Sequence, residues 1–312
     1  MFFGCRICKR TDGQHYCFSH AGEDFFLCEA CGTGYLSPGL SGSRLDAFYK
    51  SDYRRTYLYE VMGYSRALFY ASRNDLEAAH VRLADVEPAL LHGASVWEIG
   101  SGLGAFAALL GRMRPDVEIV ATEPDEAARL SFDPPGHVRF ESFEAASAGR
   151  YDLIVAFHVL EHVVDPADFL LTCRTALKPD GRLFIEVPDY EVDLSDRAFA
   201  HPAHLSYFTA SALAGLAAAS GFDVLDCTKT SRDARGHSIS LTGRPGEITW
   251  RPGAAVANGS LAADIARLRA VRVSRRAQWR SRFKRLCVGL FGPRLTADGL
   301  RCLRLLRRRL QP

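Results

Sequence analysis

The stretch from Val96 to Gly104 constrains the fold of this chain more than any other part of the sequence. Its short apolar run is typical of a buried strand, and the residues from Ala105 to about Arg112 predict a helix directly after it. A strand, a tight glycine turn and a helix in this order expose backbone N–H groups to which a ligand can bind. Glycine is required because a Cβ would block both positive φ and close approach of the ligand. The stretch therefore predicts a loop that binds a nucleotide-type cofactor.

Two cofactors fit the glycine spacing. Gly100-x-Gly102-x-x-Ala105 satisfies the dinucleotide fingerprint of NAD enzymes, with Glu123 about 20 residues later as the ribose-binding acid. Glu98, however, is expected at the mouth of the loop, where a carboxylate repels a pyrophosphate and attracts an ammonium or sulfonium group. S-adenosylmethionine (SAM) carries both of these cations and no phosphate. We therefore expect SAM rather than NAD.

Strands and helices alternate downstream of the loop at the spacing of βαβ units. Strands are expected over 117–124, 138–144, 151–157 and 182–189, with a turn at 178–181. This alternation predicts a doubly wound, mostly parallel sheet with ligands at the carboxyl ends of its strands. With the acid-x-Gly-x-Gly-x-Gly motif that begins at Glu98, the pattern resembles the class I SAM-dependent methyltransferases. The resemblance implies a Rossmann-like α/β fold and methyl transfer from SAM.

The resemblance also implies a set of cofactor contacts. Glu123 would bind the ribose hydroxyls, Ser142 and Phe143 would contact the adenine, and Phe157 and His158 would lie beside the methyl donor. The complete predicted cofactor set is Glu98, Gly100, Gly102, Gly104, Glu123, Ser142, Phe143, Phe157 and His158.

His158-x-x-Glu161-His162 also matches the inverted zinc-protease signature. That interpretation requires a long helix and a third ligand downstream, whereas here the motif follows a predicted strand at a cofactor loop. We therefore expect Glu161 and His162 to cap or support the turn.

The stretch from His201 to Thr209 is the candidate acceptor site. Methyl transfer to a hydroxyl requires alignment and a base of near-neutral pKa, which histidine provides. We expect His204 to be this base, with His201 as the second choice and Tyr207 as a positioning group. The simpler alternative is that His204 binds a backbone carbonyl before the following helix.

Residues 1–245 are similar to sugar C-methyltransferases that act on nucleotide-linked deoxysugars. Those enzymes carry Tyr-x-Glu-His where this chain has His201-Pro202-Ala203-His204. Because the carboxylate expected to help form a carbanion is missing, O-methylation of a sugar, nucleotide-sugar or glycan precursor is at least as well supported as C-methylation.

Two cysteine pairs lie near the amino terminus. Cys5-x2-Cys8 and Cys28-x2-Cys31, separated by 19 residues, have a spacing close to that of four-cysteine zinc ribbons. About 35 residues bury too little apolar surface to fold alone, so we expect a structural zinc ion. A thioredoxin-like redox pair is the alternative, but no βαβ unit surrounds either pair.

The last part of the chain differs in charge from the rest. Residues 265–312 hold 15 Lys or Arg and one acid, whereas the first 264 residues hold 24 basic and 35 acidic side chains. Basic residues mixed with Trp, Phe and Leu suit an anionic membrane surface or a lipid-linked substrate. The alternatives are a solvated amphipathic hairpin that packs on its own domain or on a dimer mate and, without a recognisable nucleic-acid-binding module, nucleic-acid or protein binding.

These patterns predict four segments: a zinc ribbon (1–40), a helical lid or linker (41–92), a methyltransferase core (93–246) and a basic helical tail (247–312). The start of the chain lacks a signal-peptide pattern, and no run reaches 18 apolar residues. We therefore expect a cytoplasmic protein, and peripheral contact of the tail with the inner face of a membrane is one open interpretation beside the packed hairpin.

Overall fold

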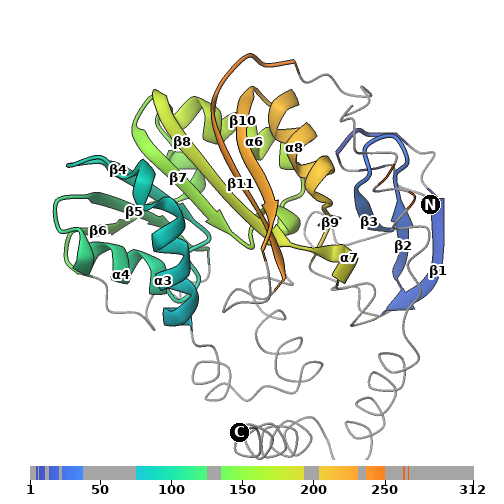
Figure 1. Cartoon of the computed structure of the whole chain (residues 1–312), viewed down its shortest axis with the longest axis horizontal. Helices are drawn as coiled ribbons and strands as arrows, with labels where there is room; N and C mark the ends of the chain where they lie inside the picture. Colours follow the sequence, from blue (N-terminus) through green and yellow to red (C-terminus); the bar gives the residue numbers. More distant parts are fainter. Residues whose placement is uncertain are drawn as a thin grey trace, which may run out of the picture. The chain divides into compact units, whose positions relative to one another are not determined.

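The computed structural model is shown in Figure 1. It describes residues 5, 7–10, 14–20, 23–37, 75–124, 135–192, 204–230, 237–249, 263 and 266. Most of the predicted lid, His201 and nearly all of the basic tail lie outside these residues.

A seven-stranded sheet forms the centre of the fold, in the order β10-β11-β8-β7-β4-β5-β6. Its strands are β4 (Ser95–Ile99), β5 (Glu118–Thr122), β6 (Val138–Phe140), β7 (Tyr151–Phe157), β8 (Leu177–Pro188), β10 (Phe222–Lys229) and β11 (Ser238–Pro245). The first five are parallel, whereas β11 is antiparallel to both β8 and β10. The predicted Rossmann-like, mostly parallel sheet is thereby confirmed.

The predicted turn at 178–181 is wrong, because β8 runs through it. Tyr151 pairs with Leu177 and Leu153 pairs with Arg182, so the extra residues are accommodated as an irregularity in the β7–β8 register.

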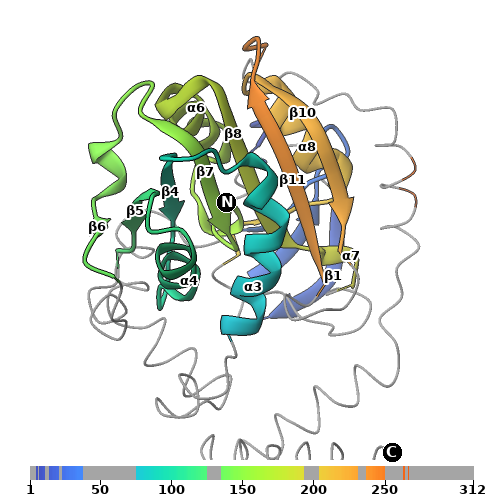
Figure 2. The same cartoon turned by 60° about the vertical axis from the view of Figure 1, so that its left-hand side comes forward.

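Helices cover both faces of the sheet (Figure 2). The longer helices are α3 (Asp75–Val86), α4 (Ala105–Met113), α6 (Pro166–Ala176) and α8 (Ala210–Ala219), and the short ones are η2 (Glu87–Ala89), η3 (Phe143–Ala145), η4 (Leu160–His162) and α7 (Tyr190–Val192). Side chains alternate along each strand, so Val96 packs with α3 and α4 while Trp97 packs with α6 and α8. Two apolar layers therefore hold the sheet between pairs of helices.

A second, four-stranded antiparallel sheet has the order β1-β2-β3-β9. It consists of β1 (Gln14–His20), β2 (Glu23–Leu27), β3 (Gly34–Ser37) and β9 (Ser206–Tyr207). The first three strands come from the cysteine-rich segment, and β9 comes from the predicted acceptor stretch. The ribbon therefore shares a sheet with residues far later in the chain, as Gly34 pairs with Tyr207, 173 positions away.

Candidate active site

The loop between β4 and α4 holds three glycines with positive φ, namely Gly100 (71°), Gly102 (56°) and Gly104 (76°). A Cβ on Gly100 would lie 2.4 Å from Val159 Cγ2, whereas a Cβ on Gly102 would meet no atom within 4 Å. Gly100 therefore allows close packing against the turn after β7. Gly102 borders open space, where a ligand can approach the backbone.

A cavity of about 520 Å³ lies beside this loop, at the carboxyl ends of β4 and β5. Gly100, Glu123, Ser142 and Phe143 line it, so the structure brings together four of the predicted cofactor residues. The Gly102 N–H donates a 2.8 Å hydrogen bond to Glu123 Oε2, which holds the carboxylate at the edge of the loop. This is the position from which an acid can accept hydrogen bonds from ribose hydroxyls.

Ser101 provides a further polar group in the loop. Its Oγ is buried and has no hydrogen-bond partner within the described part of the chain. A buried hydroxyl without a partner is costly, and a polar ligand at the loop would satisfy it. The loop, the cavity and this hydroxyl together fit a nucleoside-type cofactor such as SAM.

Phe143 belongs to an aromatic stack in the cavity wall. Its ring is nearly parallel to that of Phe169, with 5.3 Å between centroids and 4° between planes, and it stacks with Trp97 at 5.5 Å. The Trp97 Nε1–H donates to Thr122 Oγ1 at 2.8 Å and fixes the indole in turn. The stack gives the cavity a rigid apolar wall suited to an adenine ring.

Glu98 lies behind the glycine loop, in contrast to the position at its mouth that we expected. The side chain is 3% exposed, and Oε2 accepts a 3.1 Å hydrogen bond from the Ala107 N–H in the first turn of α4. Burial raises the pKa of Glu98 to about 8, although Arg82 and the Ala107 N–H act in the opposite direction. The carboxyl is therefore mostly protonated at pH 7, so its charge alone does not discriminate SAM from a dinucleotide.

Phe157, the last residue of β7, is buried in the core and does not line the cavity. Its ring packs edge-on against Phe106 at 4.9 Å, and the guanidinium of Arg82 lies over it at 4.6 Å. The alternation of side chains along β7 explains the difference from the expected cofactor contact, because Phe157 shares the α3 and α4 face with Val155.

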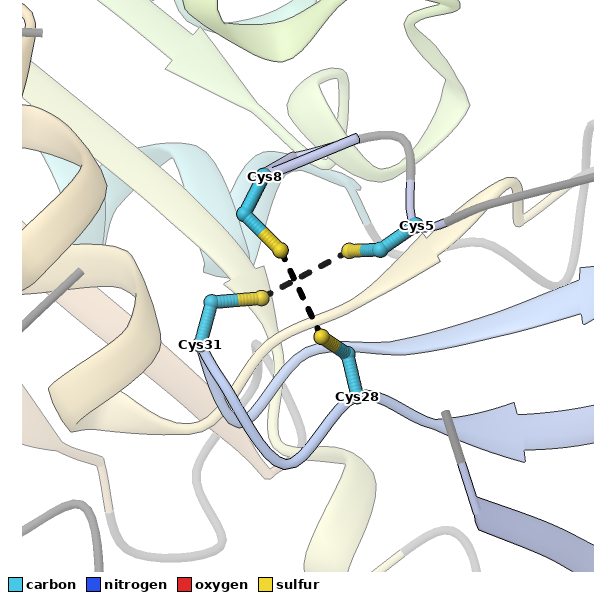
Figure 3. A group of neighbouring side chains, drawn as sticks. All are labelled: Cys5, Cys8, Cys28 and Cys31. Atoms are coloured by element: carbon cyan, nitrogen blue, oxygen red, sulfur yellow. Dashed lines mark hydrogen bonds between the residues drawn. The ribbon is translucent and has the colours of Figure 1, made fainter. Parts of the chain in front are cut away.

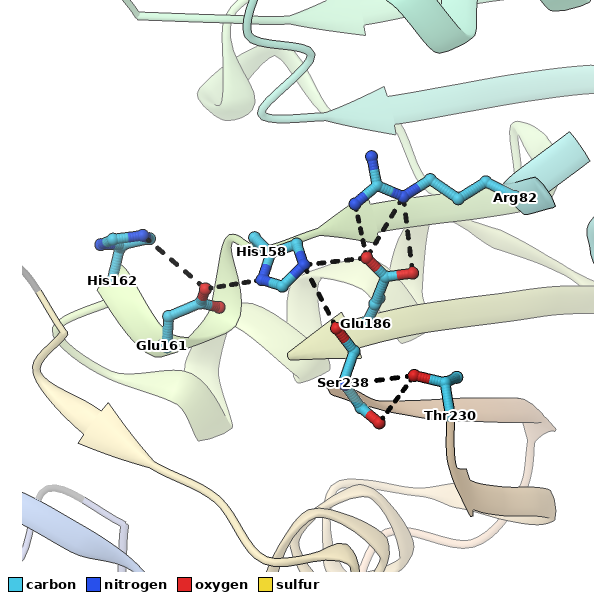
Figure 4. A network of polar contacts seen from close by, with 7 residues as sticks. All are labelled: Arg82, His158, Glu161, His162, Glu186, Thr230 and Ser238. Carbon is cyan, nitrogen blue, oxygen red and sulfur yellow. Dashed lines mark hydrogen bonds and ion pairs between the residues drawn. The ribbon is translucent and has the colours of Figure 1, made fainter. Parts of the chain in front are cut away.

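His158 is the centre of a polar network that joins three strands (Figure 4). It has a φ of 57°, which is uncommon for a residue other than glycine. Its Nε2 lies 2.9 Å from Glu186 Oε1 on β8, and its Nδ1 lies 3.5 Å from Glu161 Oε1. Arg82 on α3 donates to the same Glu186 carboxylate from Nε at 3.2 Å, and Ser238 Oγ on β11 lies 3.5 Å from His158 Nε2.

The charges in this network stabilise one another. Burial lowers the pKa of His158, but Glu161 and Glu186 outweigh it and raise this pKa to about 9. Burial raises the pKa of Glu186, but His158 and Arg82 outweigh it and lower this pKa to about 2. His158 is therefore a paired imidazolium that orders the end of β7, and at neutral pH it cannot accept a proton.

His204 and Tyr207 lie against the same turn after β7. The His204 ring contacts that of His162, with 4.7 Å between centroids, and lies 5.8 Å from the Tyr207 ring. Glu161 completes the group, because its carboxylate and the two histidine rings each place one donor atom within 4.8 Å of the others. His201 lies outside the described residues. The structure thus places two of the three predicted catalytic residues together, and their roles stay predictions.

The four predicted metal ligands converge on one point (Figure 3). Cys5 Sγ lies 3.5 Å from Cys31 Sγ, and Cys8 Sγ lies 3.4 Å from Cys28 Sγ. All four thiols are buried and none forms a disulfide. In a tetrahedral zinc site with Zn–S bonds of about 2.3 Å, neighbouring sulfurs are roughly 3.8 Å apart. The arrangement therefore fits a zinc ion with no open position.

Sequence reasoning did not single out Arg82, Glu186 or Ser101. Arg82 lies in the segment predicted as a lid or linker, where nothing marks it as a partner of the core. Glu186 did leave a signal, because an acid within an apolar strand requires a partner when the strand is buried. Ser101 lies between two motif glycines, and only its burial reveals an unsatisfied hydroxyl.

Comparison with known proteins agrees with this geometry. Residues 70–226 match the family model described as a methyltransferase domain. The ubiquinone biosynthesis O-methyltransferase of Xanthomonas axonopodis pv. citri (strain 306) is 34% identical over 110 residues, which cover 33% of this chain and 45% of that protein. The mitochondrial ubiquinone biosynthesis O-methyltransferase of Bos taurus is 33% identical over 134 residues, which cover 36% of each chain. The matched stretch thus spans less than half the length of these relatives.

A solved structure resembles the fold over a larger part of the chain. The 1,6-didemethyltoxoflavin-N1-methyltransferase of Burkholderia thailandensis, with 1,6-didemethyltoxoflavin and S-adenosylhomocysteine bound, has a TM-score of 0.51 and 22% identity, and the likeness covers 75% of this chain and 100% of that one. The glycine loop, the sheet order and the family match, which spans half of the sequence, lead to one conclusion. The chain belongs to the methyltransferase-domain family.

Proposed function

We propose that the protein transfers a methyl group from SAM to a hydroxyl oxygen of a sugar, nucleotide-sugar or glycan-type small molecule. The observation that carries the proposal is that the turn after β7 lies between the cofactor cavity and the predicted acceptor residues. Val159 and Val163 of this turn line the cofactor cavity, while Glu161 and His162 of the same turn contact His204 or lie beside it. Acceptor and cofactor would therefore meet across a single turn.

SAM supplies an already activated methyl group on a sulfonium. The task left to the protein is to hold the two reactants in line and to help an acceptor hydroxyl lose its proton. Gly102, Glu123 and the Phe143 wall would hold the cofactor. His204, His201 and Tyr207 would face the acceptor, with His204 acting on the hydroxyl.

Two similarities support the acceptor class. The names of the curated relatives denote O-methylation, which favours oxygen over carbon as the acceptor atom. The resemblance of residues 1–245 to sugar methyltransferases favours a sugar-type molecule. Transfer to carbon, as in those enzymes, is the alternative outcome.

We also propose that zinc occupies the four-cysteine site in a structural role. The closed tetrahedron of buried thiols supports this role, because it leaves no position for a substrate.

Cofactor binding is tested by titration calorimetry with SAM. Gly102→Arg is expected to abolish binding, since its side chain would fill the open space at the loop. Gly93→Arg is the matched control, because Gly93 has a similar φ of 66° and equally open surroundings at the opposite end of β4. Equal SAM affinity in the parent and in Gly102→Arg would contradict the assignment of the cofactor site.

Acceptor chemistry is tested by mass spectrometry across a panel of nucleotide sugars and glycans. A methyl-mass gain on a hydroxyl is expected, with a loss of on the order of 100-fold in His204→Ala, the usual size of an acid–base contribution. Methylation confined to carbon, or full activity in His204→Ala, would contradict the proposal.

A further inference from the structure

Glu161 is a buried carboxylate whose oxygens lack hydrogen bonds. The residue is 1% exposed, and neither Oε1 nor Oε2 has a hydrogen-bond partner within the described ranges. The nearest ring nitrogens are His158 Nδ1 at 3.5 Å and His162 Nε2 at 3.7 Å, beyond good hydrogen-bond length (Figure 4). The His158 imidazolium, 3.5 Å away, offsets part of the cost of burying this carboxylate, but two oxygens without a hydrogen-bond partner still point to a ligand that binds them.

Two imidazoles complete a set of metal donors around this carboxylate. Glu161 and His162 come from η4, His204 comes from the segment before β9, and the donor atoms of the three residues lie within 4.8 Å of one another. Donors of a tetrahedral site with bonds of about 2.0–2.1 Å are roughly 3.3 Å apart. The 3.7 Å between Glu161 and His162 is close to this value, so small side-chain rotations would bring the set to ligating distance.

We propose that Glu161, His162 and His204 bind a divalent metal ion of the zinc type, separate from the four-cysteine site. Two imidazoles and one carboxylate form the donor set of open zinc sites, which retain a position for a water or a substrate oxygen. The inference rests on the proposed function in one respect, since the open position would receive a hydroxyl of the acceptor. His204 would then act on the acceptor hydroxyl through the metal ion, because a bound metal ion lowers the pKa of an oxygen ligand.

The neighbouring His158 is excluded from the ligand set by its own partners. Its Nε2 is held by Glu186 at 2.9 Å on the side away from His162. The motif His158-x-x-Glu161-His162 therefore supplies two donors and not three, and its geometry differs from that of the inverted zinc proteases. Here the pair lies on a short 3₁₀ turn, and the third donor comes from 42 residues later in the chain.

The experiment measures metal content of the full-length protein after equilibration with buffered micromolar free Zn²⁺. Two zinc ions per chain are expected in the parent. His204→Ala and Glu161→Gln should each lose one ion and keep the other. His80→Ala, which removes an exposed histidine on α3, is the matched control and should keep both.

Exchange of zinc for cobalt gives a second measurement, which uses the protein with its parent amino-acid sequence. Co²⁺ in the parent protein should show visible bands of a nitrogen and oxygen site in addition to thiolate charge-transfer bands. One zinc ion per chain in the parent, an unchanged zinc content in His204→Ala, or thiolate-type cobalt bands alone would each overturn the proposal.

Methyl transfer assayed on the same samples separates this inference from the proposed function. Hydroxyl methylation by protein that binds only the ribbon zinc would overturn the metal site and leave the function standing. Two bound ions without methylation of any hydroxyl acceptor would overturn the function and leave the site standing.

Discussion

Glu98 carries its carboxyl group into the space between β4 and the first turn of α4. Burial raises its pKa to about 8, so the folded protein holds a proton that the unfolded chain, with an ordinary pKa near 4.5, releases. Unfolding therefore releases a proton at any pH between these two pKa values. The contribution of Glu98 to the free energy of unfolding is therefore largest below about pH 4.5. It falls as the pH rises towards 8 and becomes constant once the carboxyl group of the folded protein also ionises.

We expect Glu98→Gln to remove this pH dependence, since the amide is neutral at every pH and its oxygen can still accept from the Ala107 N–H. The variant should match the parent near pH 5 and exceed its stability near pH 8, with a difference that grows by up to about 1.4 kcal/mol per pH unit. Urea unfolding at several pH values measures the difference. Glu87→Gln, at an exposed position in η2, is the control, and parallel pH profiles of Glu98→Gln and parent would contradict the prediction.

The strand β9 connects the ribbon to the acceptor side of the core. It pairs with β3 through Gly34–Tyr207 and Tyr35–Ser206, and the Leu205 N–H donates to Glu161 O at 2.7 Å. A two-residue strand has little stability of its own. Its position, and with it that of His204, therefore depends on the cysteine site that orders β3.

We expect Cys28→Ser to release the ribbon zinc and to loosen β9 while the central sheet persists. Hydrogen-exchange protection at Ser206 and Tyr207 should fall by on the order of tenfold or more, with little change in β4 and β7. Cys227→Ser is the control, because the Cys227 thiol lies outside the ribbon, where it donates to Ala210 O. Unchanged protection of β9 in a zinc-free Cys28→Ser protein would show that the ribbon does not order this strand.

The chain consists of two consecutive parts with net charges of opposite sign. The first 264 residues have a net charge of −11, and residues 265–312 have a net charge of +14. Within the described ranges, no helix is long and apolar enough to span a membrane. Our proposal for the tail is contact with an anionic lipid surface on the cytoplasmic side, supported by its mixture of Arg, Trp, Phe and Leu.

The full chain is expected to co-sediment with vesicles that contain phosphatidylserine and to remain free with vesicles of phosphatidylcholine alone. Replacing Arg307, Arg308 and Arg309 by Gln should weaken binding by about 3 kcal/mol, or roughly 100-fold, since each basic residue near the surface contributes about 1 kcal/mol. Raising the salt concentration should weaken it as well. Equal binding to both vesicle types would rule out the electrostatic contact.

Local patterns in the sequence were sufficient for the cofactor loop, the mostly parallel sheet and the convergence of the cysteines. Gly100 and Gly102 adopt the positive φ that their motif predicts, because glycine lacks a Cβ and populates this backbone region readily. The parallel strands were predictable because βαβ units leave a regular apolar period. Cys5, Cys8, Cys28 and Cys31 were predictable as one site because two close pairs complete a tetrahedron.

Only the tertiary structure decided which way particular side chains face and which distant residues meet. Glu98 and Phe157 point under α3 and α4, a choice set by which face of the sheet each helix covers. Arg82 meets Glu186 across 104 residues of sequence, and β3 pairs with β9 across about 170. Such contacts depend on packing between elements that no local pattern encodes, and they determine the charges and donors around the turn after β7.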